Sequence, residues 1–250
     1  MSNTWLKPGP AQNERARSGT DEAMTESKRT ALGISLGAIA LHWTYQIVTE
    51  RSAPAPPAHF SDFVLAVVRN KLIVFGAVAL LLRVGGERFS ALGVSRQNWE
   101  QHLRTGLVAG LAMFVGLNVA LNSLMNSLIP APPASGPSVM MFFKQPANLL
   151  IWLPIGILGG GVVEEIERIF ILTRFEKALG RPGLIVGVVL SSAMFGVGHL
   201  YQGLGTALAT AVSGLVFALV FLRRRSALEP IVAHAFSDVL AMLAATMLAR

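Results

Sequence analysis

The chain has 250 residues, of which 52% are hydrophobic and only 14% are charged, and its mean hydropathy is +0.54. Soluble domains carry about 25% charged residues, so this composition excludes an ordinary soluble domain and favours a polytopic membrane protein. The chain contains no Cys, which excludes disulfides, thiolate-ligated metal sites and thiol catalysis. The net charge of +7 does not indicate a nucleic-acid partner, because the basic residues gather at the ends of apolar segments, as topology signals do.

The N-terminal segment differs from the rest of the chain. Residues 1–30 are polar, mixed in charge and free of apolar periodicity, so we expect them to form a disordered tail. The next segment, 31–48, is apolar and long enough to span a membrane. His42 lies within this span, where we expect a packed, hydrogen-bonded side chain.

A second span is predicted over 60–84, after a Pro-rich loop at 51–59. Its first third is interrupted by three polar residues, Arg69, Asn70 and Lys71. Two interpretations fit this interruption. Either the basic side chains reach out to the membrane interface, or the span proper begins near Leu72.

A polar connector at 85–104 comes next, and we expect an interfacial helix in it that holds Trp99. The third span is predicted over 105–129, followed by a Pro-rich loop at 130–146. Three asparagines lie four residues apart on one face of this span: Asn118, Asn122 and Asn126. Such a stripe is typical of hydrogen bonds between the helices of a bundle, and the alternative is that it lines a substrate path.

The C-terminal part contains four further apolar segments, at 148–179, 183–200, 203–222 and 228–248. Gly156 and Gly160 form a GxxxG pair in the first of them, which favours close helix approach. Gly180 and Pro182 mark a turn between the first two segments, because Gly is frequent just past a helix end and Pro at a helix start. The sequence therefore predicts an all-α, polytopic transmembrane bundle of about seven spans with a polar N-terminal tail.

Three regions are expected: a tail at 1–30, N-terminal transmembrane helices and connectors at 31–147, and a catalytic helical core at 148–250. With seven spans, fifteen Lys and Arg residues fall on the side of the N-terminus and three on the other side. Basic residues are retained on the cytoplasmic side of membranes. The asymmetry predicts an integral membrane protein with a cytoplasmic N-terminus, in the cell or inner membrane if the source is bacterial.

One apolar segment carries four charges within five positions: Glu164, Glu165, Glu167 and Arg168. A charge at the centre of a bilayer costs about 2.5–3.5 kcal/mol on insertion scales, so such residues are functional-site candidates by default. At about 100° per residue, Arg168 falls between Glu164 and Glu165 on the helix wheel. The charged face is therefore expected to look into the protein or a wet cavity, with Glu167 at its edge as a paired or solvated residue.

Three more ionisable residues lie in the apolar C-terminal segments: His199, His234 and Asp238. If the segments on either side of the Gly-Arg-Pro turn form an antiparallel hairpin, Glu164 and His199 stand at the same depth, because they lie 16 and 17 residues from its two ends. His234 and Asp238 share one helix face, since they are four residues apart. Three helices can therefore bring one Glu and two His together.

These motifs, in this order, resemble those of the type II CAAX prenyl endopeptidase family, also called the CPBP or Abi family of intramembrane proteases. The family carries a Glu-Glu pair followed by Arg, then FxxxH, then HxxxN or HxxxD. This chain has Glu164-Glu165-Ile166-Glu167-Arg168, Phe195-Gly196-Val197-Gly198-His199 and His234-Ala235-Phe236-Ser237-Asp238. The resemblance covers residues 148–248. The Arg stands one position closer to the Glu pair than in the family's EExxxR motif.

The resemblance implies that Glu164 is the catalytic carboxylate and that His199 helps it to hold a water. His234 would donate a hydrogen bond to the developing oxyanion. Asp238 would fix the tautomer and orientation of His234. The expected catalytic set is completed by Glu165, and the supporting residues are Arg168, as a salt-bridge partner of the Glu pair, and Phe195.

Two chemistries fit this set. One Glu and two His are a known catalytic zinc set, so Glu164, His199 and His234 would be the ligands of Zn²⁺ if a metal is used. Without a metal, Glu164 would be the group that activates the water, with His199 helping to hold it. The family has carried a metalloprotease label, and a metal-free glutamate mechanism has also been proposed for it, so the resemblance leaves the cofactor open.

The sequence thus predicts an intramembrane endopeptidase that hydrolyses a peptide bond in a membrane-anchored substrate, prenylated or not. The expected partners are that peptide or protein and the lipid bilayer, with no nucleic acid. Three other interpretations fit. The chain would be a non-catalytic immunity or scaffold protein of the same family, or a proton-coupled transporter, against which the lack of an inverted repeat argues. The charged residues would otherwise form a purely structural ion cluster.

Overall fold

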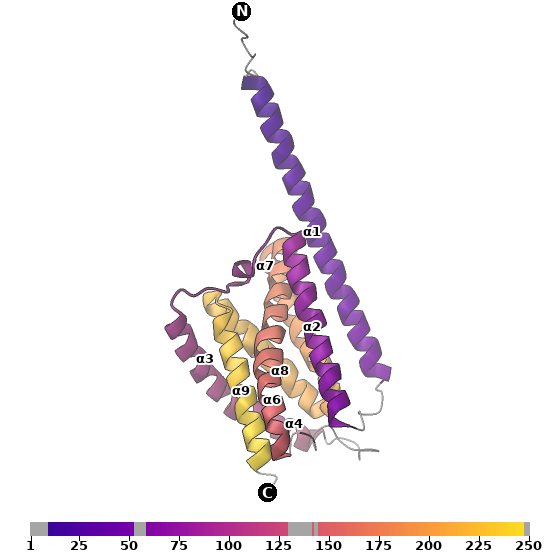
Figure 1. The fold of residues 1–250 in the computed structure, drawn as a ribbon, viewed down its shortest axis with the longest axis vertical. Helices are drawn as coiled ribbons and strands as arrows, with labels where there is room; N and C mark the ends of the chain where they lie inside the picture. The colour runs from indigo at the N-terminus through magenta and orange to yellow at the C-terminus, as the bar shows by residue number, and fades with distance from the viewer. Residues whose placement is uncertain (1–9, 53–58, 130–141, 143–144, 248–250) are drawn as a thin grey trace, which may run out of the picture.

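The computed structural model describes residues 10–52, 59–129, 142 and 145–247 (Figure 1). It is 90% helical, without strands in those ranges, which confirms the all-α prediction. The principal helices are α1 (Pro10–Ser52), α2 (Phe60–Val84), α3 (Trp99–Met113), α4 (Asn122–Leu128), α6 (Leu149–Ile155), α7 (Glu165–Val197), α8 (Leu204–Arg224) and α9 (Leu228–Met247). Two π-helices join them, η2 (Phe114–Leu121) and η4 (Gly156–Glu164). Three short 3₁₀ turns are η1 (Phe89–Leu92), η3 (Pro146–Asn148) and η5 (Leu200–Gln202).

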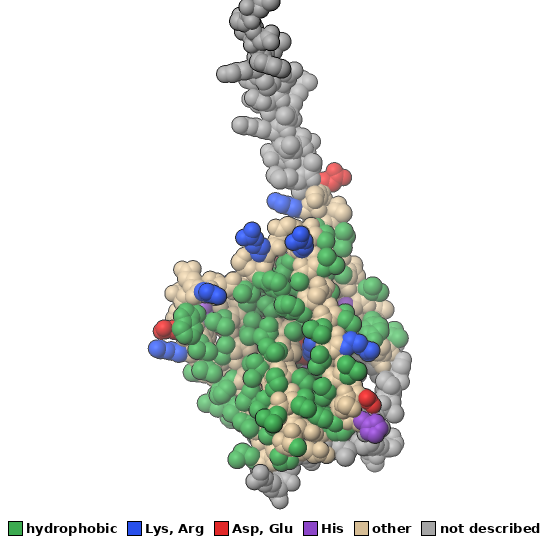
Figure 2. Space-filling model, in the orientation of Figure 1, with side chains coloured by type: hydrophobic (Ala, Val, Ile, Leu, Met, Phe, Trp, Pro, Cys, Tyr) green, Lys and Arg blue, Asp and Glu red, His purple; other side chains and the backbone are tan. Residues whose placement is uncertain are grey.

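The outer surface of the bundle is apolar. Six helical segments in the described ranges are long and apolar enough to cross a membrane. Large apolar side chains point outward along them, including Leu41, Val108 and Leu150. Hydrophobic side chains cover most of the face seen in Figure 2, whereas Lys and Arg gather mainly towards its upper end. Such a surface is stable only in contact with lipid, so the chain is an integral membrane protein.

The longest segment folds back on itself at Gly180. Residues Pro146–Val197 comprise 52 residues, which as a straight helix would extend about 78 Å at 1.5 Å per residue, more than twice the hydrocarbon core. Gly180 has φ 63° and ψ −145°, outside the helical region. After it, Gly183 faces Phe175 and Gly187 faces Leu172, so the two halves run antiparallel. The hairpin raises the number of crossings to seven, as predicted.

The turns that join the helices meet at one end of the bundle. Glu87, after α2, pairs with Arg174 and Lys177 of α7 at 2.7 and 2.6 Å. Arg225, after α8, pairs with Glu176 of α7 at 2.6 Å. These contacts place the connector after α2, the Gly180 turn and the α8–α9 turn together, on the side to which the seven-span prediction assigns them.

The N-terminal region differs from its prediction. Helix α1 begins at Pro10, so residues 10–30, expected to be disordered, form a helix that projects beyond the bundle (Figure 1). Pro is favoured in the first helical turn. The following residues lack further Pro, and extending an existing span avoids the cost of nucleating a new helix. Residues 1–9 lie outside the described ranges.

The second and third spans test the predicted boundaries. Helix α2 has the predicted bounds, Phe60–Val84. The prediction of a separate interfacial helix around Trp99 is wrong. Trp99 is the first residue of α3, which continues through η2 into α4 as one long span. Asn98 adopts a left-handed conformation, with φ 52°, at the point where the chain enters α3. Most of the two predicted Pro-rich loops, at 53–58 and 130–141, lies outside the described residues.

The asparagine stripe of the third span joins helices, as the first interpretation predicted. Asn118 donates a hydrogen bond to Ser237 of α9 at 2.9 Å. Asn126 donates one to Thr206 of α8 at 3.2 Å. Hydrogen bonds between helices stabilise a bundle in lipid, where an unpaired amide is costly.

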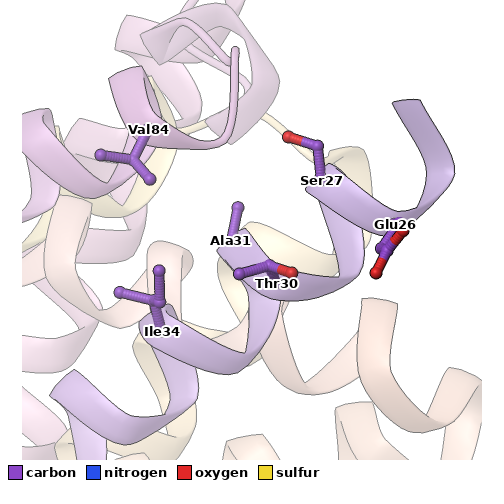
Figure 3. A pocket seen from close by; sticks show the side chains of 6 residues that line it. All are labelled: Glu26, Ser27, Thr30, Ala31, Ile34 and Val84. Atoms are coloured by element: carbon purple, nitrogen blue, oxygen red, sulfur yellow. The ribbon is translucent and has the colours of Figure 1, made fainter. Parts of the chain in front are cut away.

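The buried core surrounds the first half of α7. Ile169, Phe170 and Leu172 are almost fully buried there and pack with Leu82 of α2 and Phe221 of α8. A pocket of about 360 Å³ lies elsewhere, between α1 and the end of α2 (Figure 3). Its lining residues are Glu26, Ser27, Thr30, Ala31, Ile34 and Val84, and none of the predicted site residues is among them.

Candidate active site

Glu164 and Glu165 lie at the junction of η4 and α7, where glycines bring α9 close. A Cβ on Gly160 would stand 2.5 Å from Oδ2 of Asp238, and one on Gly161 would stand 2.6 Å from Cβ of Ala235. Gly also disfavours a regular α-helix, and the segment adopts the π-helical form that is frequent at functional sites. Gly160 and Gly161, together with Gly156, where a Cβ would stand 2.6 Å from Cε of Met242, therefore create the close contact with α9 that the GxxxG pair predicted.

Glu165 is the fully buried member of the Glu pair. Its carboxylate accepts hydrogen bonds from Nε of Arg168 at 3.1 Å and from Nδ1 of His234 at 2.8 Å. Sequence analysis expected Asp238 to orient His234, but the structure gives that hydrogen bond to Glu165. Asp238 lies on the other side of the ring, 3.6 Å from Nε2.

Arg168 is held by aromatic rings as well as by charge. Its guanidinium carbon lies 4.3 Å from the ring centroid of Phe195 and 5.7 Å from that of Phe217, in cation–π contact. Gly214 of α8 gives the guanidinium room, because a Cβ there would stand 2.9 Å from Nη1. The expected salt bridge thus forms with Glu165, and Phe195 supports it.

Glu164 is the more accessible member of the pair. Its side chain keeps 15% of its surface exposed, against 0% for Glu165. Oε1 accepts a hydrogen bond from Nζ of Lys71 in α2. Oε2 lies 3.7 Å from Nε2 of His234, beyond hydrogen-bonding distance. One carboxylate oxygen is therefore fixed, and the other faces the histidine of α9.

Lys71 was not predicted as a site residue. Sequence analysis expected it either to reach out to the membrane interface or to precede a span that begins near Leu72, whereas the structure directs its ammonium to Glu164. The available signal was the position of a lysine inside an apolar span, which by itself marks a functional-site candidate.

His199 lies just beyond the end of α7, and the Phe195 ring contacts both its imidazole, at 4.8 Å between centroids, and that of His234, at 5.8 Å. Its Nδ1 is 2.8 Å from the carbonyl oxygen of Phe195. A carbonyl only accepts hydrogen bonds, so Nδ1 carries a proton, and in the neutral form of the ring Nε2 presents a lone pair. The hairpin at Gly180 thus brings His199 to the same site as Glu164, as expected.

Glu167 and His42 form a separate pair at the edge of the site. Nε2 of His42 in α1 lies 3.1 Å from Oε1 of Glu167. This contact confirms that Glu167 is a paired flank and that His42 is a hydrogen-bonded residue of the first span.

The residues do not fit a zinc site in this arrangement. In the described part of the chain, no three His, Asp or Glu side chains are grouped as metal ligands. Oε1 of Glu164 is engaged by the ammonium of Lys71, a fixed cation that stands where a metal ion would bind this oxygen. Glu164, His199 and His234 are neighbours, but they do not converge on a common point as tetrahedral ligands would.

Comparison with known protein families identifies this part of the chain. Residues 146–240 match the family described as Rce1-like: Type II CAAX prenyl endopeptidase Rce1-like. No curated protein and no solved structure matched the chain. The matched residues span α6 to the middle of α9 and include all seven predicted site residues. The resemblance is therefore confirmed: residues 146–240 match an Rce1-like type II CAAX prenyl endopeptidase domain.

Proposed function

We propose that the protein hydrolyses a peptide bond in a membrane-anchored peptide or protein, with Glu164 as the proton-transferring carboxylate. The observation that carries this proposal is the partial pairing of Glu164: Oε1 is bound by Lys71, and Oε2 faces His234 without a hydrogen bond. A carboxylate with one free oxygen can accept a proton from water. The family match over residues 146–240 supports an endopeptidase in general.

In the proposed reaction, a water lies between Oε2 of Glu164 and Nε2 of His199. The Nε2 lone pair accepts one hydrogen bond from this water and orients it. Glu164 takes a proton as the water oxygen attacks the carbonyl carbon of the substrate. The C–N bond then breaks, and the same proton passes from Glu164 to the leaving nitrogen. The products are a carboxylic acid and an amine.

His234 would stabilise the oxyanion of the tetrahedral intermediate. Nδ1 donates to Glu165, so its proton is fixed. Nε2 lies 3.7 Å from Oε2 of Glu164 and 3.6 Å from Oδ2 of Asp238. The negative charge of these two carboxylates favours a proton on Nε2. A positioned N–H donor of this kind typically contributes 10²–10³-fold to the rate of acyl transfer.

The remaining assignments are proposals of the same kind. The catalytic region is residues 148–250, preceded by N-terminal transmembrane helices and connectors at 31–147. The N-terminus is cytoplasmic, on the strength of the basic-residue asymmetry. The substrate carries a membrane anchor, which includes prenylated CAAX-type peptides as the first class to test.

The test is cleavage of prenylated and unmodified transmembrane peptides by purified protein in lipid nanodiscs. Glu164→Gln is expected to lower kcat by about 10²–10⁴-fold, the usual range for a general acid–base group, with an unchanged melting temperature. Glu167→Gln is the matched control, because it removes a neighbouring carboxylate that pairs with His42, and it should keep kcat within about threefold. Cleavage by Glu164→Gln at the wild-type rate would refute the proposal. A folded wild type that cleaves nothing, with a cellular phenotype indifferent to Glu164→Gln, would favour the scaffold function instead.

A further inference from the structure

Lys71 points inward from a helix whose neighbouring residues face lipid. Leu72 and Ile73 are 68% and 64% exposed on the outside of α2. The side chain of Lys71 is only 26% exposed and ends on Glu164. An ammonium within a membrane span is costly unless it is paired, so this contact accounts for the charge in the middle of an apolar helix.

The side chain of Lys71 packs along the π-helix η4. A Cβ on Gly159 would stand 3.4 Å from Cγ and 3.7 Å from Cε of Lys71. The aliphatic part of Lys71 therefore lies along the backbone of η4 at Gly159, five residues before the carboxylate that its ammonium binds. Lys71 therefore reaches Glu164 along the backbone of η4, in ordinary van der Waals contact with it.

Each glutamate of the pair has its own cation. Arg168, from the same helix, holds Glu165. Lys71, from a helix outside the family-matched region, holds Glu164. The two cations therefore come from different helices, and the carboxylate that Lys71 binds is that of Glu164.

We infer that Lys71 is a positioning residue of the active site, which fixes Oε1 of Glu164 and occupies the side of this carboxylate where a divalent metal ion would bind. The inference rests on the proposed function, and it explains why the residues do not fit a zinc site. A fixed ammonium leaves Oε2 as the oxygen that meets water. It also repels a second cation from the same carboxylate.

The experiment compares the full chain in nanodiscs with three α2 variants. Lys71→Met removes the charge and keeps an unbranched side chain, and Lys71→Arg keeps the charge. Arg69→Met is the matched control, because Arg69 is a basic residue of the same helix with an exposed side chain. Two assays are run. The first gives kcat and KM for the peptide that wild type cleaves, and the second gives the zinc bound per protein after dialysis against zinc sulfate.

Lys71→Met is expected to lower kcat at least tenfold with KM within about twofold of wild type. Lys71→Arg should keep at least a third of the wild-type kcat, and Arg69→Met should leave it unchanged. Wild type should bind no zinc that depends on Glu164. Lys71→Met should retain about one zinc per protein after dialysis, and adding Glu164→Gln should abolish that gain.

A wild-type kcat in Lys71→Met would overturn the inference, as would an equal loss in Arg69→Met or in Lys71→Arg. Zinc bound by wild type at Glu164, or no gain of zinc in Lys71→Met, would overturn it too. Failure of the proposed function looks different, because wild type then cleaves nothing or Glu164→Gln stays active. The zinc measurements still decide in that case whether Lys71 is the cation that keeps a metal from Glu164.

Discussion

Two groups of charged residues in this bundle use the same residue types in different ways. At the end of the bundle, Arg174 binds both oxygens of Glu87 at 2.7 and 2.8 Å, and Lys177 adds a third bond. In the middle, Lys71 binds one oxygen of Glu164, while the other has only distant neighbours. A fully paired carboxylate stabilises the fold and has no oxygen left for chemistry. A half-paired one keeps an oxygen available for a water.

The same contrast divides the Glu pair. Glu165 is buried, bound by Arg168 and His234, and behaves like the carboxylate at the end of the bundle. Glu164 is its neighbour in the chain and is partly accessible. Under the proposed function, Glu165 belongs to the scaffold of the site and Glu164 to its chemistry, and three changes test that division.

The largest effect is expected from Arg168→Met. It leaves Glu165 buried without its guanidinium, and breaking a buried ion pair from one side typically costs about 3–5 kcal/mol. The variant should therefore unfold at a clearly lower temperature in detergent, as measured by intrinsic fluorescence. Adding Glu165→Gln should recover part of the loss, because the uncompensated charge is removed. An Arg168→Met variant as stable as wild type would break the comparison, since Glu165 would not need its partner.

A smaller effect is expected from Gly160→Ala, which adds one methyl group against Oδ2 of Asp238. Overpacking of a tight contact typically costs about 1–3 kcal/mol, and here it also shifts α9 away from Glu164. Both the melting temperature and kcat should fall. Gly76→Ala in α2 is the control, because nothing lies within 4 Å of a Cβ at that position, and it should leave both unchanged. Equal behaviour of the two variants would show that the site tolerates a looser contact with α9.

The smallest effect is expected from Glu87→Gln, and it depends on pH. The hydrogen bond from Arg174, supported by Lys177, lowers the pKa of Glu87 from 4.5 to about 2. A lowered folded-state pKa stabilises the protein above the unfolded-state value, and this stabilisation is lost as the pH falls towards the folded-state value. Because the group is partly exposed and screened, we expect about 1 kcal/mol at pH 7.

Unfolding of wild type and Glu87→Gln should therefore be compared at pH 7 and at steps from pH 5 to pH 3. The difference in melting temperature should shrink over that lower range. A difference in melting temperature that is constant with pH would mean that the charge of Glu87 does not stabilise the fold. Glu87 could then no longer serve as the stabilising counterpart of Glu164.

Much of the architecture could be predicted because it depends on local signals. An apolar window gives α2 its bounds, and the Gly-Arg-Pro turn gives the hairpin that brings His199 towards Glu164. Lys71 could not be assigned to Glu164, because the two residues are 93 positions apart and their contact depends on how α2 is rotated about its axis. The partner of His234 was likewise undetermined, since Glu165 and Asp238 are both carboxylates near the same ring. The packing of η4 against α9 determines that Glu165 faces Nδ1 of His234 and Asp238 faces Nε2.

The turn at Gly180 has a consequence for compartments. A chain that crosses a bilayer an odd number of times leaves its first and last helices open to different aqueous phases. The projecting part of α1 and the far end of α9, which lie at opposite ends of Figure 1, are then separated by the membrane. A protein that binds the start of α1 and one that binds the end of α9 would therefore approach the bundle from opposite sides of the membrane.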